Sequence, residues 1–218
     1  MKHLLIISFA FLLGGFGLKA QDDFSLEIYE EGDQLWGFSY SFGFPSGEFR
    51  NFIDETSFRG FHFDYEYFVM NNLSVGLNSS YTLFNEINER DSYTIESENT
   101  GVTISSKIWR YTHVVPIHLT SRYYFSFFED NQTANLFGGI GIGWTYINQE
   151  AWVGLSTFRE ESWKFSMAPE LGIDLNTGGR YNIQISGQYL YIPNGLQLVN
   201  ENNFESWNLK VGFRKWIY

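Results

Sequence analysis

The chain has 218 residues, of which 25 are acidic, 14 are Lys or Arg and none is Cys, so its formal net charge at pH 7 is −11. The lack of cysteine excludes a disulfide scaffold, Cys-ligated metal sites and a lipid-modified N-terminal cysteine. The acidic balance argues against a nucleic-acid partner, because nucleic-acid binding needs a basic face. Aromatic residues make up 20% of the chain, a content typical of amphipathic strands and foreign to disordered chains.

Residues 1–20 have the pattern of a secretory signal peptide. Lys2 and His3 precede an apolar run from Leu4 to Leu18, and Ala20 is a small residue at a suitable cleavage position. The run is short for a transmembrane helix, although a retained membrane anchor is the alternative. We therefore expect export by a cleaved signal peptide and a mature domain over residues 21–218.

Eight segments of the mature chain alternate between apolar and polar residues, which is the period of a β-strand. In chain order their apolar positions run from Trp36 to Phe44, Phe61 to Val69, Leu73 to Leu83, Val115 to Tyr123, Ile140 to Tyr146, Trp163 to Ile173, Tyr181 to Tyr191 and Trp207 to Phe213. No segment has a convincing helical period. Near Lys215 the alternation slips, which predicts a bulge or a strand end with Trp216 and Tyr218 facing outward.

The polar faces of these segments decide between two kinds of sheet. A soluble sandwich or a periplasmic calycin-like barrel buries its apolar face, whereas a membrane barrel turns that face to lipid. The polar faces of the first, third, fifth and seventh segments carry almost only Gly, Ser, Thr, Asn and Gln, as a narrow lumen filled with side chains requires. The sequence predicts an all-β fold, an eight-stranded antiparallel up-and-down transmembrane β-barrel. The soluble alternatives stay open at this point.

The connections between the segments alternate in length. Those after the odd-numbered segments are long, at about 45–57, 85–104, 148–161 and 192–204, and those after the even-numbered segments are short, at 70–72, about 126–133 and 176–180. Outer-membrane barrels have long external loops and short periplasmic turns. We expect the long connections outside the cell and both termini in the periplasm. Four aromatic residues of the long connections are interpreted as loop packing, with a ligand platform as the alternative: Phe49, Phe52, Trp152 and Phe158.

Further features carry a family resemblance. They are Phe42-Gly43-Phe44-Pro45-Ser46-Gly47, the stretch from Val115 to Leu119, the glycine-rich stretch from Gly138 to Gly143, and the terminal aromatic Tyr218. Together with the signal peptide, they resemble the small outer-membrane β-barrel domain family of Gram-negative bacteria, which includes OmpW-like and OmpX/OmpA-type barrels. The resemblance implies location in the cell outer membrane, contact with outer-membrane lipids and lipopolysaccharide, and recognition of Tyr218 by the barrel-assembly machinery. It implies no activity, because this fold hosts pores, adhesins, anchors and enzymes.

Nine ionisable side chains fall on the predicted luminal faces: His62, Asp64, Glu66, His118, Arg122, Glu170, Asp174, Lys210 and Arg214. Buried charges must be paired and hydrogen-bonded, so we interpret the nine as a structural charge network with at least one arginine–carboxylate contact below about 4 Å. A catalytic or proton-linked site, with a histidine beside a carboxylate, is the alternative. A divalent metal site has less support, because no metal-binding spacing such as HxH or HExxH exists. We predict no cofactor and no metal.

The residues for acyl transfer are missing from the place where the resemblance would put them. Outer-membrane lipid A deacylases carry a His-x-Ser-Asn-type segment near the last strands, and the corresponding stretch Tyr191-Ile192-Pro193-Asn194-Gly195 has neither His nor Ser. His118 and Ser121 fall on opposite faces of one strand and cannot form a dyad.

The sequence favours a non-enzymatic integral outer-membrane barrel with a structural or loop-mediated binding role. A narrow channel for small or apolar molecules, as in OmpW-like barrels, is the alternative, and a lipid-modifying enzyme is a weaker one.

Overall fold

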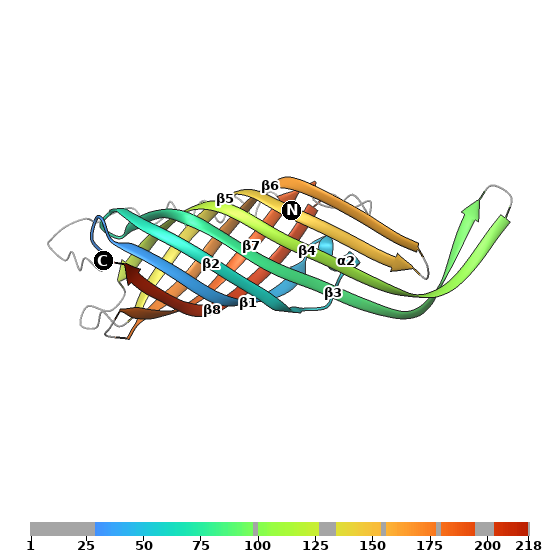
Figure 1. The fold of residues 1–218 in the computed structure, drawn as a ribbon, viewed down its shortest axis with the longest axis horizontal. Helices are drawn as coiled ribbons and strands as arrows, with labels where there is room; N and C mark the ends of the chain where they lie inside the picture. Colours follow the sequence, from blue (N-terminus) through green and yellow to red (C-terminus); the bar gives the residue numbers. More distant parts are fainter. Residues whose placement is uncertain are drawn as a thin grey trace, which may run out of the picture.

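Eight antiparallel strands form a closed barrel in which each strand pairs with its neighbours in the chain and β8 closes onto β1 (Figure 1). The structure is a computed structural model that describes residues 29–97, 100–126, 134–153, 156–177, 180–194 and 203–217. The strands are β1 (Gln34–Ser46), β2 (Ser57–Met70), β3 (Leu73–Ser97), β4 (Thr100–Ser126), β5 (Ala134–Val153), β6 (Ser156–Asn176), β7 (Tyr181–Pro193) and β8 (Asn203–Ile217). The predicted eight-stranded up-and-down barrel is confirmed.

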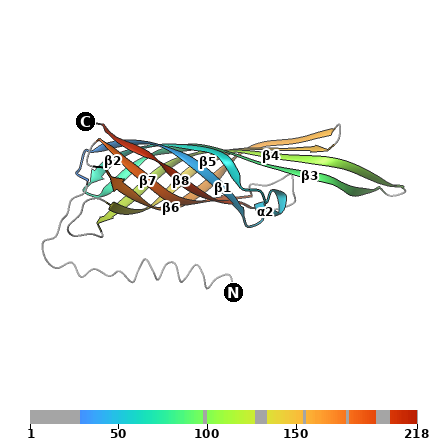
Figure 2. The same cartoon turned by 90° about the horizontal axis from the view of Figure 1, so that it is seen from below.

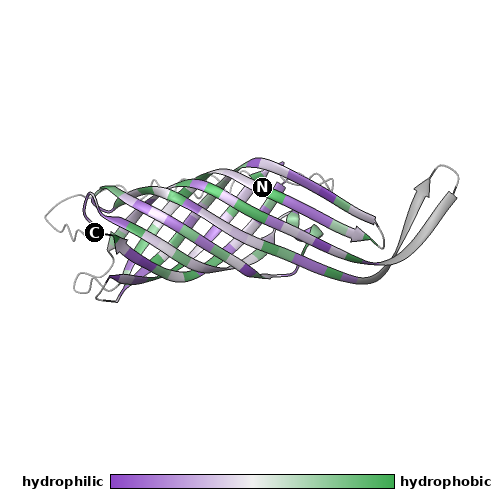
Figure 3. Ribbon diagram, viewed as in Figure 1, coloured by the Kyte–Doolittle hydropathy of each residue, from purple (hydrophilic) through white to green (hydrophobic). Residues whose placement is uncertain are grey.

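The apolar face of each strand points out of the barrel and the polar face points into it. Large apolar side chains such as Phe38, Leu119 and Leu171 are 42%, 66% and 67% exposed. Hydrophilic and hydrophobic residues alternate along the strands at the front of the barrel in Figure 3. The outward apolar run of β5 extends from Leu136 to Tyr146, close to the about 9–11 residues of a tilted membrane-spanning strand. This arrangement is the inside-out pattern of a transmembrane barrel.

Aromatic side chains mark the two edges of the apolar surface. At one edge Tyr146 packs against Trp163 and Tyr189 against Trp207, with ring centroids 5.5 Å and 4.8 Å apart. At the other edge Trp36 meets the ring of Phe213 edge-on. Such belts are typical of barrels that span a bilayer, because Trp and Tyr have an apolar body and a polar tip.

Residues 85–104 and 148–161 are predicted to be long loops, but they lie mostly in strands, so this part of the prediction is wrong. β3 continues to Ser97 and β5 to Val153, and in both cases the next strand begins within three residues. β3 and β4 stay paired beyond the aromatic belt, with Ile87 opposite Trp109, and after a register shift between Asn88 and Asp91 the pairing continues to Ser97 opposite Thr100. The sequence pattern hid these extensions, because beyond the membrane the outward positions no longer need to be apolar. The parts of β3, β4, β5 and β6 that continue beyond the aromatic belt at Tyr146 and Trp163 are called the extended sheet (Figures 1 and 2).

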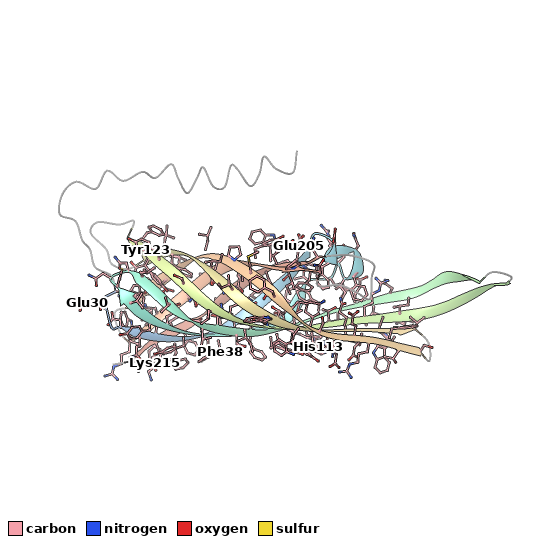
Figure 4. The ribbon with its side chains drawn as sticks, turned by 90° about the horizontal axis from the view of Figure 1, so that it is seen from above. Glu30, Phe38, His113, Tyr123, Glu205 and Lys215 are labelled. Carbon is pink, nitrogen blue, oxygen red and sulfur yellow. The ribbon has the colours of Figure 1, made fainter. Side chains whose placement is uncertain are left out.

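The barrel therefore has two unlike ends. The end that carries the extended sheet is called the sheet end, and the opposite end, where Met70 and Leu73 are joined by a two-residue turn, is called the turn end. Figure 4 labels Glu30 and Lys215 near the turn end and Glu205 near the sheet end. The one described helix, α2 (Phe49–Phe52), has four residues and lies at the sheet end (Figure 2). No helix among the described residues is long and apolar enough to cross a membrane.

The predicted irregularity near Lys215 is absent from the described part of β8. The pairing of β8 with β1 is unbroken up to Gln34 opposite Ile217, so Trp216 points inward and stacks on the ring of Tyr29 at 5.2 Å. Lys215 faces outward, with its ammonium 5.9 Å from the ring of Tyr181. The expectation that Trp216 faces outward is wrong, because an apolar contact at the turn end holds it inside. Tyr218 and the predicted signal peptide lie outside the described residues.

A closed barrel of this kind should resist unfolding by detergent at room temperature. We expect the refolded chain to migrate faster on a gel when it is not heated than when it is boiled, because the closed sheet keeps it compact. Boiled protein should run near its mass of 25.4 kDa. Circular dichroism provides the check, and a helix-dominated spectrum would contradict the fold.

Candidate functional site: the closed lumen

Arg122 of β4 is the centre of an ionic layer in the middle of the lumen. Its Nη2 donates to Glu170 Oε2 at 2.8 Å, and its Nη1 donates to Asp64 Oδ2 at 3.4 Å and to Glu66. The side chain is 1% exposed. One guanidinium therefore joins carboxylates of β2 and β6 across the axis of the barrel.

Arg214 of β8 extends this layer toward the turn end. Its Nη1 donates to Asp174 Oδ2 at 2.5 Å and to Tyr124 Oη at 2.7 Å. Its guanidinium also pairs with Glu66 and lies 3.6 Å from Asp64. Because Glu66 and Asp64 contact both arginines, the two guanidinium groups belong to one network.

Lys210 completes the layer, with Nζ 2.7 Å from Glu170 Oε1. The structure thus brings seven of the nine predicted luminal residues into one continuous set of ion pairs: Asp64, Glu66, Arg122, Glu170, Asp174, Lys210 and Arg214. Four carboxylates face three cations. The phenol groups of Tyr29 and Tyr124 donate to Asp174 and Glu66 at 3.1 Å and 2.7 Å, which gives the acids further hydrogen bonds.

Glycines on neighbouring strands make the room that these long side chains need. A Cβ on Gly139 of β5 would lie 2.6 Å from Cγ of Arg122, and a Cβ on Gly37 of β1 would lie 2.8 Å from Oδ1 of Asp64. Any larger residue would push the charged side chain out of its place. Gly37 and Gly139 are therefore steric requirements of the ionic layer, whereas Gly141 and Gly143 of the glycine-rich stretch lie against His118.

The two histidines, His62 and His118, lie beside the ionic layer. His62 Nδ1 is 3.5 Å from Asp64 Oδ1, and His118 Nε2 is 2.8 Å from Ser166 Oγ. Thr145 donates its hydroxyl to the same Ser166 oxygen at 2.7 Å. The sequence did not reveal this His–Ser pair, because it depends on the register that places β6 two strands away from β4.

A hydroxyl bonded to an imidazole has the geometry of a nucleophile and its base. Here His118 and Ser166 are 1% and 0% exposed, and His118 Nδ1 has no hydrogen-bond partner among the described residues. Among the described residues the pair thus has no orienting acid, and both of its side chains are buried. In the described part of the chain, no group of three or more His, Asp or Glu residues is placed to hold a metal ion.

Tyr29 closes the lumen at the turn end. Its ring stacks on Phe68 at 4.5 Å and lies 4.6 Å from Tyr124, and its hydroxyl reaches Asp174. The Asn72 N–H donates to the carbonyl oxygen of Tyr29 at 3.1 Å, and the Tyr29 N–H donates to Asn72 Oδ1 at 3.3 Å. These two hydrogen bonds hold the segment before β1 at the turn end. The sequence gives no sign of this cap, because the bond from Tyr29 to Asp174 joins residues that are 145 positions apart.

The helix α2 closes the lumen at the sheet end. Phe49 packs against Phe204 and Phe84, with ring centroids 4.2 Å and 5.1 Å apart, and Arg110 Nη1 donates to the carbonyl oxygen of Phe52 at 2.9 Å. The buried apolar cluster comprises Phe49, Phe52, Ile53, Phe84, Val114, Ile147, Ala168, Leu190, Ile192 and Phe204. On the solvent side of α2, a hydrogen bond to Asp54 raises the pKa of the Arg50 guanidinium.

The four aromatic residues predicted to pack in loops lie in two different environments. Phe49 and Phe52 pack, as expected, although they do so inside the barrel. Trp152 and Phe158 lie on strands of the extended sheet and are 42% and 56% exposed, so the expectation of loop packing is wrong for these two. Beyond the membrane the strand alternation continues, and it leaves side chains on both faces of the sheet open to solvent.

No family model matches the chain, and no curated protein matches it. Among solved structures, neisserial surface protein A matches with a TM-score of 0.51 at 15% identity, covering 85% of this chain and 97% of that chain. The chain has the fold of the small outer-membrane β-barrels. Ail of Yersinia pestis (TM-score 0.43, 16% identity, 84% and 99% covered) and OprG of Pseudomonas aeruginosa (0.44, 14%, 87% and 98%) also match. At these identities the similarity concerns the fold alone.

Removal of the central guanidinium should strongly destabilise the barrel. We expect Arg122→Ala to lower the free energy of unfolding by roughly 3–5 kcal/mol, because buried carboxylates lose their shared partner. Urea unfolding of the refolded protein, followed by tryptophan fluorescence, measures this change. The matched control is Arg50→Ala, which removes an arginine from an exposed ion pair and should change stability little. An unchanged stability of Arg122→Ala would show that water solvates the luminal charges independently.

Proposed function

We propose that the protein is a non-enzymatic, integral outer-membrane β-barrel whose lumen is closed and whose extended sheet has a binding role outside the cell. The observation that carries this proposal is the filling of the lumen by three successive layers. Tyr29 and its aromatic neighbours close the turn end, the ionic layer around Arg122 fills the middle, and α2 closes the sheet end. The apolar outward surface with its two aromatic belts supports insertion in a bilayer.

The proposal includes an orientation and a set of partners. The sheet end lies outside the cell, and the turn end lies in the periplasm with both termini. Outer-membrane lipids and lipopolysaccharide surround the apolar belt, the signal peptide of residues 1–20 is cleaved, and the barrel-assembly machinery recognises Tyr218. Support comes from the difference between the two ends, because outer-membrane barrels have short periplasmic turns and longer external extensions.

Single cysteines test this orientation, because the chain has none of its own. An impermeant maleimide on intact cells should label Asn88→Cys, in the extended sheet, and should not label Thr177→Cys, beyond β6 at the turn end. After permeabilisation of the outer membrane, both variants should react. Labelling of Thr177→Cys but not Asn88→Cys on intact cells would reverse the proposed orientation.

The closed lumen makes a second prediction, which concerns ion conduction. The interior of an eight-stranded barrel is only just filled by side chains, and here each layer is packed or ion-paired. We expect no conductance steps from the refolded protein in a planar lipid bilayer. Phe49→Ala should stay silent as well, because the ionic layer and the Tyr29 cap remain. Discrete steps from the wild-type protein would contradict the closed lumen and favour a channel.

The alternative function, a narrow channel for small or apolar molecules, is favoured by one observation. The part of the lumen at the sheet end, here called the chamber, is apolar, and Phe49 and Phe52 of α2 fill it together with strand side chains such as Phe204. A shift of this short helix would open the chamber without any change in strand pairing. Uptake of an apolar solute into proteoliposomes distinguishes the two functions. Uptake by the wild-type protein that rises in Phe49→Ala supports the channel, and uptake equal to that of empty liposomes rejects it.

A further inference from the structure

A row of large apolar side chains crosses the outward face of the extended sheet. Ile87 of β3 is opposite Trp109 of β4, and Trp109 is opposite Trp152 of β5. Residues directly opposite in antiparallel strands have Cβ atoms about 5 Å apart, so the three side chains form one surface. They are 45%, 38% and 42% exposed. We call these three residues the tryptophan row.

A polar row lies beside the tryptophan row and holds Trp152 in place. The indole Nε1 of Trp152 donates to Glu150 Oε2 at 3.3 Å. Glu150 is itself held by Arg159, whose Nε is 3.3 Å from Glu150 Oε1, and by Asn148, whose Nδ2 donates to the same oxygen at 3.4 Å. Arg159 also pairs with Glu161 at 2.8 Å. The aromatic surface therefore has a fixed orientation and a rim of charged and amide groups.

The tryptophan row stands well above the apolar belt. Trp152 lies six positions beyond Tyr146 on β5, which corresponds to about 20 Å along a strand and about 15 Å along the barrel axis at the usual strand tilt. On β4, His113 lies between the aromatic belt and the tryptophan row. Figure 4 shows His113 at the base of the extended sheet. Hydrocarbon tails do not reach this height. The proposed orientation puts the row beside the polar parts of the surrounding lipids.

The size of the tryptophan row limits what it can bind. Two Trp side chains and one Ile at these exposures offer about 300 Å² of apolar surface, whereas one side of a stable protein–protein interface buries about 800 Å². A flat, rigid surface of this size fits one or two small rings. A rim of carboxylate, guanidinium and amide groups suits hydroxyl groups at the edge of such a ring.

We propose that the tryptophan row binds saccharide rings in the core oligosaccharide of the lipopolysaccharide around the barrel. The C–H face of a sugar ring packs on the indole rings, whose faces carry partial negative charge. Ring hydroxyls hydrogen-bond to Glu150 and Arg159. This proposal rests on the proposed function, because it takes the outer leaflet as the surroundings of the extended sheet.

The test is a binding titration of the full chain refolded in detergent, against core oligosaccharide released from lipopolysaccharide and against lipid A alone. We expect the double variant Trp109→Ala/Trp152→Ala to bind the oligosaccharide at least about tenfold more weakly than the wild type, and the two proteins to bind lipid A equally. The matched control is Phe158→Ala, which removes an exposed aromatic ring from the opposite face of the same sheet and should leave the affinity unchanged.

Other variants and measurements separate the possible outcomes. Trp109→Phe/Trp152→Phe keeps aromatic faces and should retain most of the affinity, and unheated gel mobility verifies that each variant folds. Equal oligosaccharide affinity of the double alanine variant and the wild type would overturn the proposal, as would wild-type self-association that is lost in this variant. Membrane fractionation tests the proposed outer-membrane location independently of the binding titration. A wild-type chain absent from the outer membrane would refute the proposed function, whereas the titration would still report on the tryptophan row.

Discussion

The need to neutralise Arg122 inside a narrow barrel shapes much of this structure. A buried guanidinium has five N–H donors and no means of losing its charge, so it must have acceptors on several sides. Asp64, Glu66 and Glu170 provide them from strands on either side of β4. Their side chains can reach Arg122 only because residues such as Gly139 leave space beside it. Gly139 of β5 and the distribution of acids on β2 and β6 thus have one common cause.

The same requirement supports the proposal that the barrel holds a shape and does not conduct. An ion or solute crossing the lumen would have to separate Arg122 from its carboxylates in a medium where unpaired charges are costly. It would also have to displace Tyr29 at the turn end and Phe49 at the sheet end. These barriers are in series, so opening any one of them leaves the others. The extended sheet, by contrast, offers its side chains without any such barrier.

The sequence predicts the barrel and the luminal positions because both depend on local alternation. Once eight strands are recognised, parity alone assigns Asp64, Arg122 and Arg214 to the inner face. Alternation does not predict the length of β5 beyond the apolar belt, because the outward positions there, such as Asn148 and Glu150, do not face hydrocarbon. It does not predict the Tyr29 cap or the His118–Ser166 pair either, since each depends on contacts between distant parts of the chain.

Strand register couples the lumen to the extended sheet. β4 carries Arg122 and His118 on its inner face and, nearer the sheet end, Trp109 on its outer face. A slip of one residue against β5 would turn all three side chains to the opposite faces. Close packing opposes such a slip, because Gly143 faces His118 and a Cβ at that position would lie 2.1 Å from the carbonyl oxygen of Ile117. The contacts that fix charged groups in the lumen therefore also determine which aromatic side chains the protein presents above the membrane.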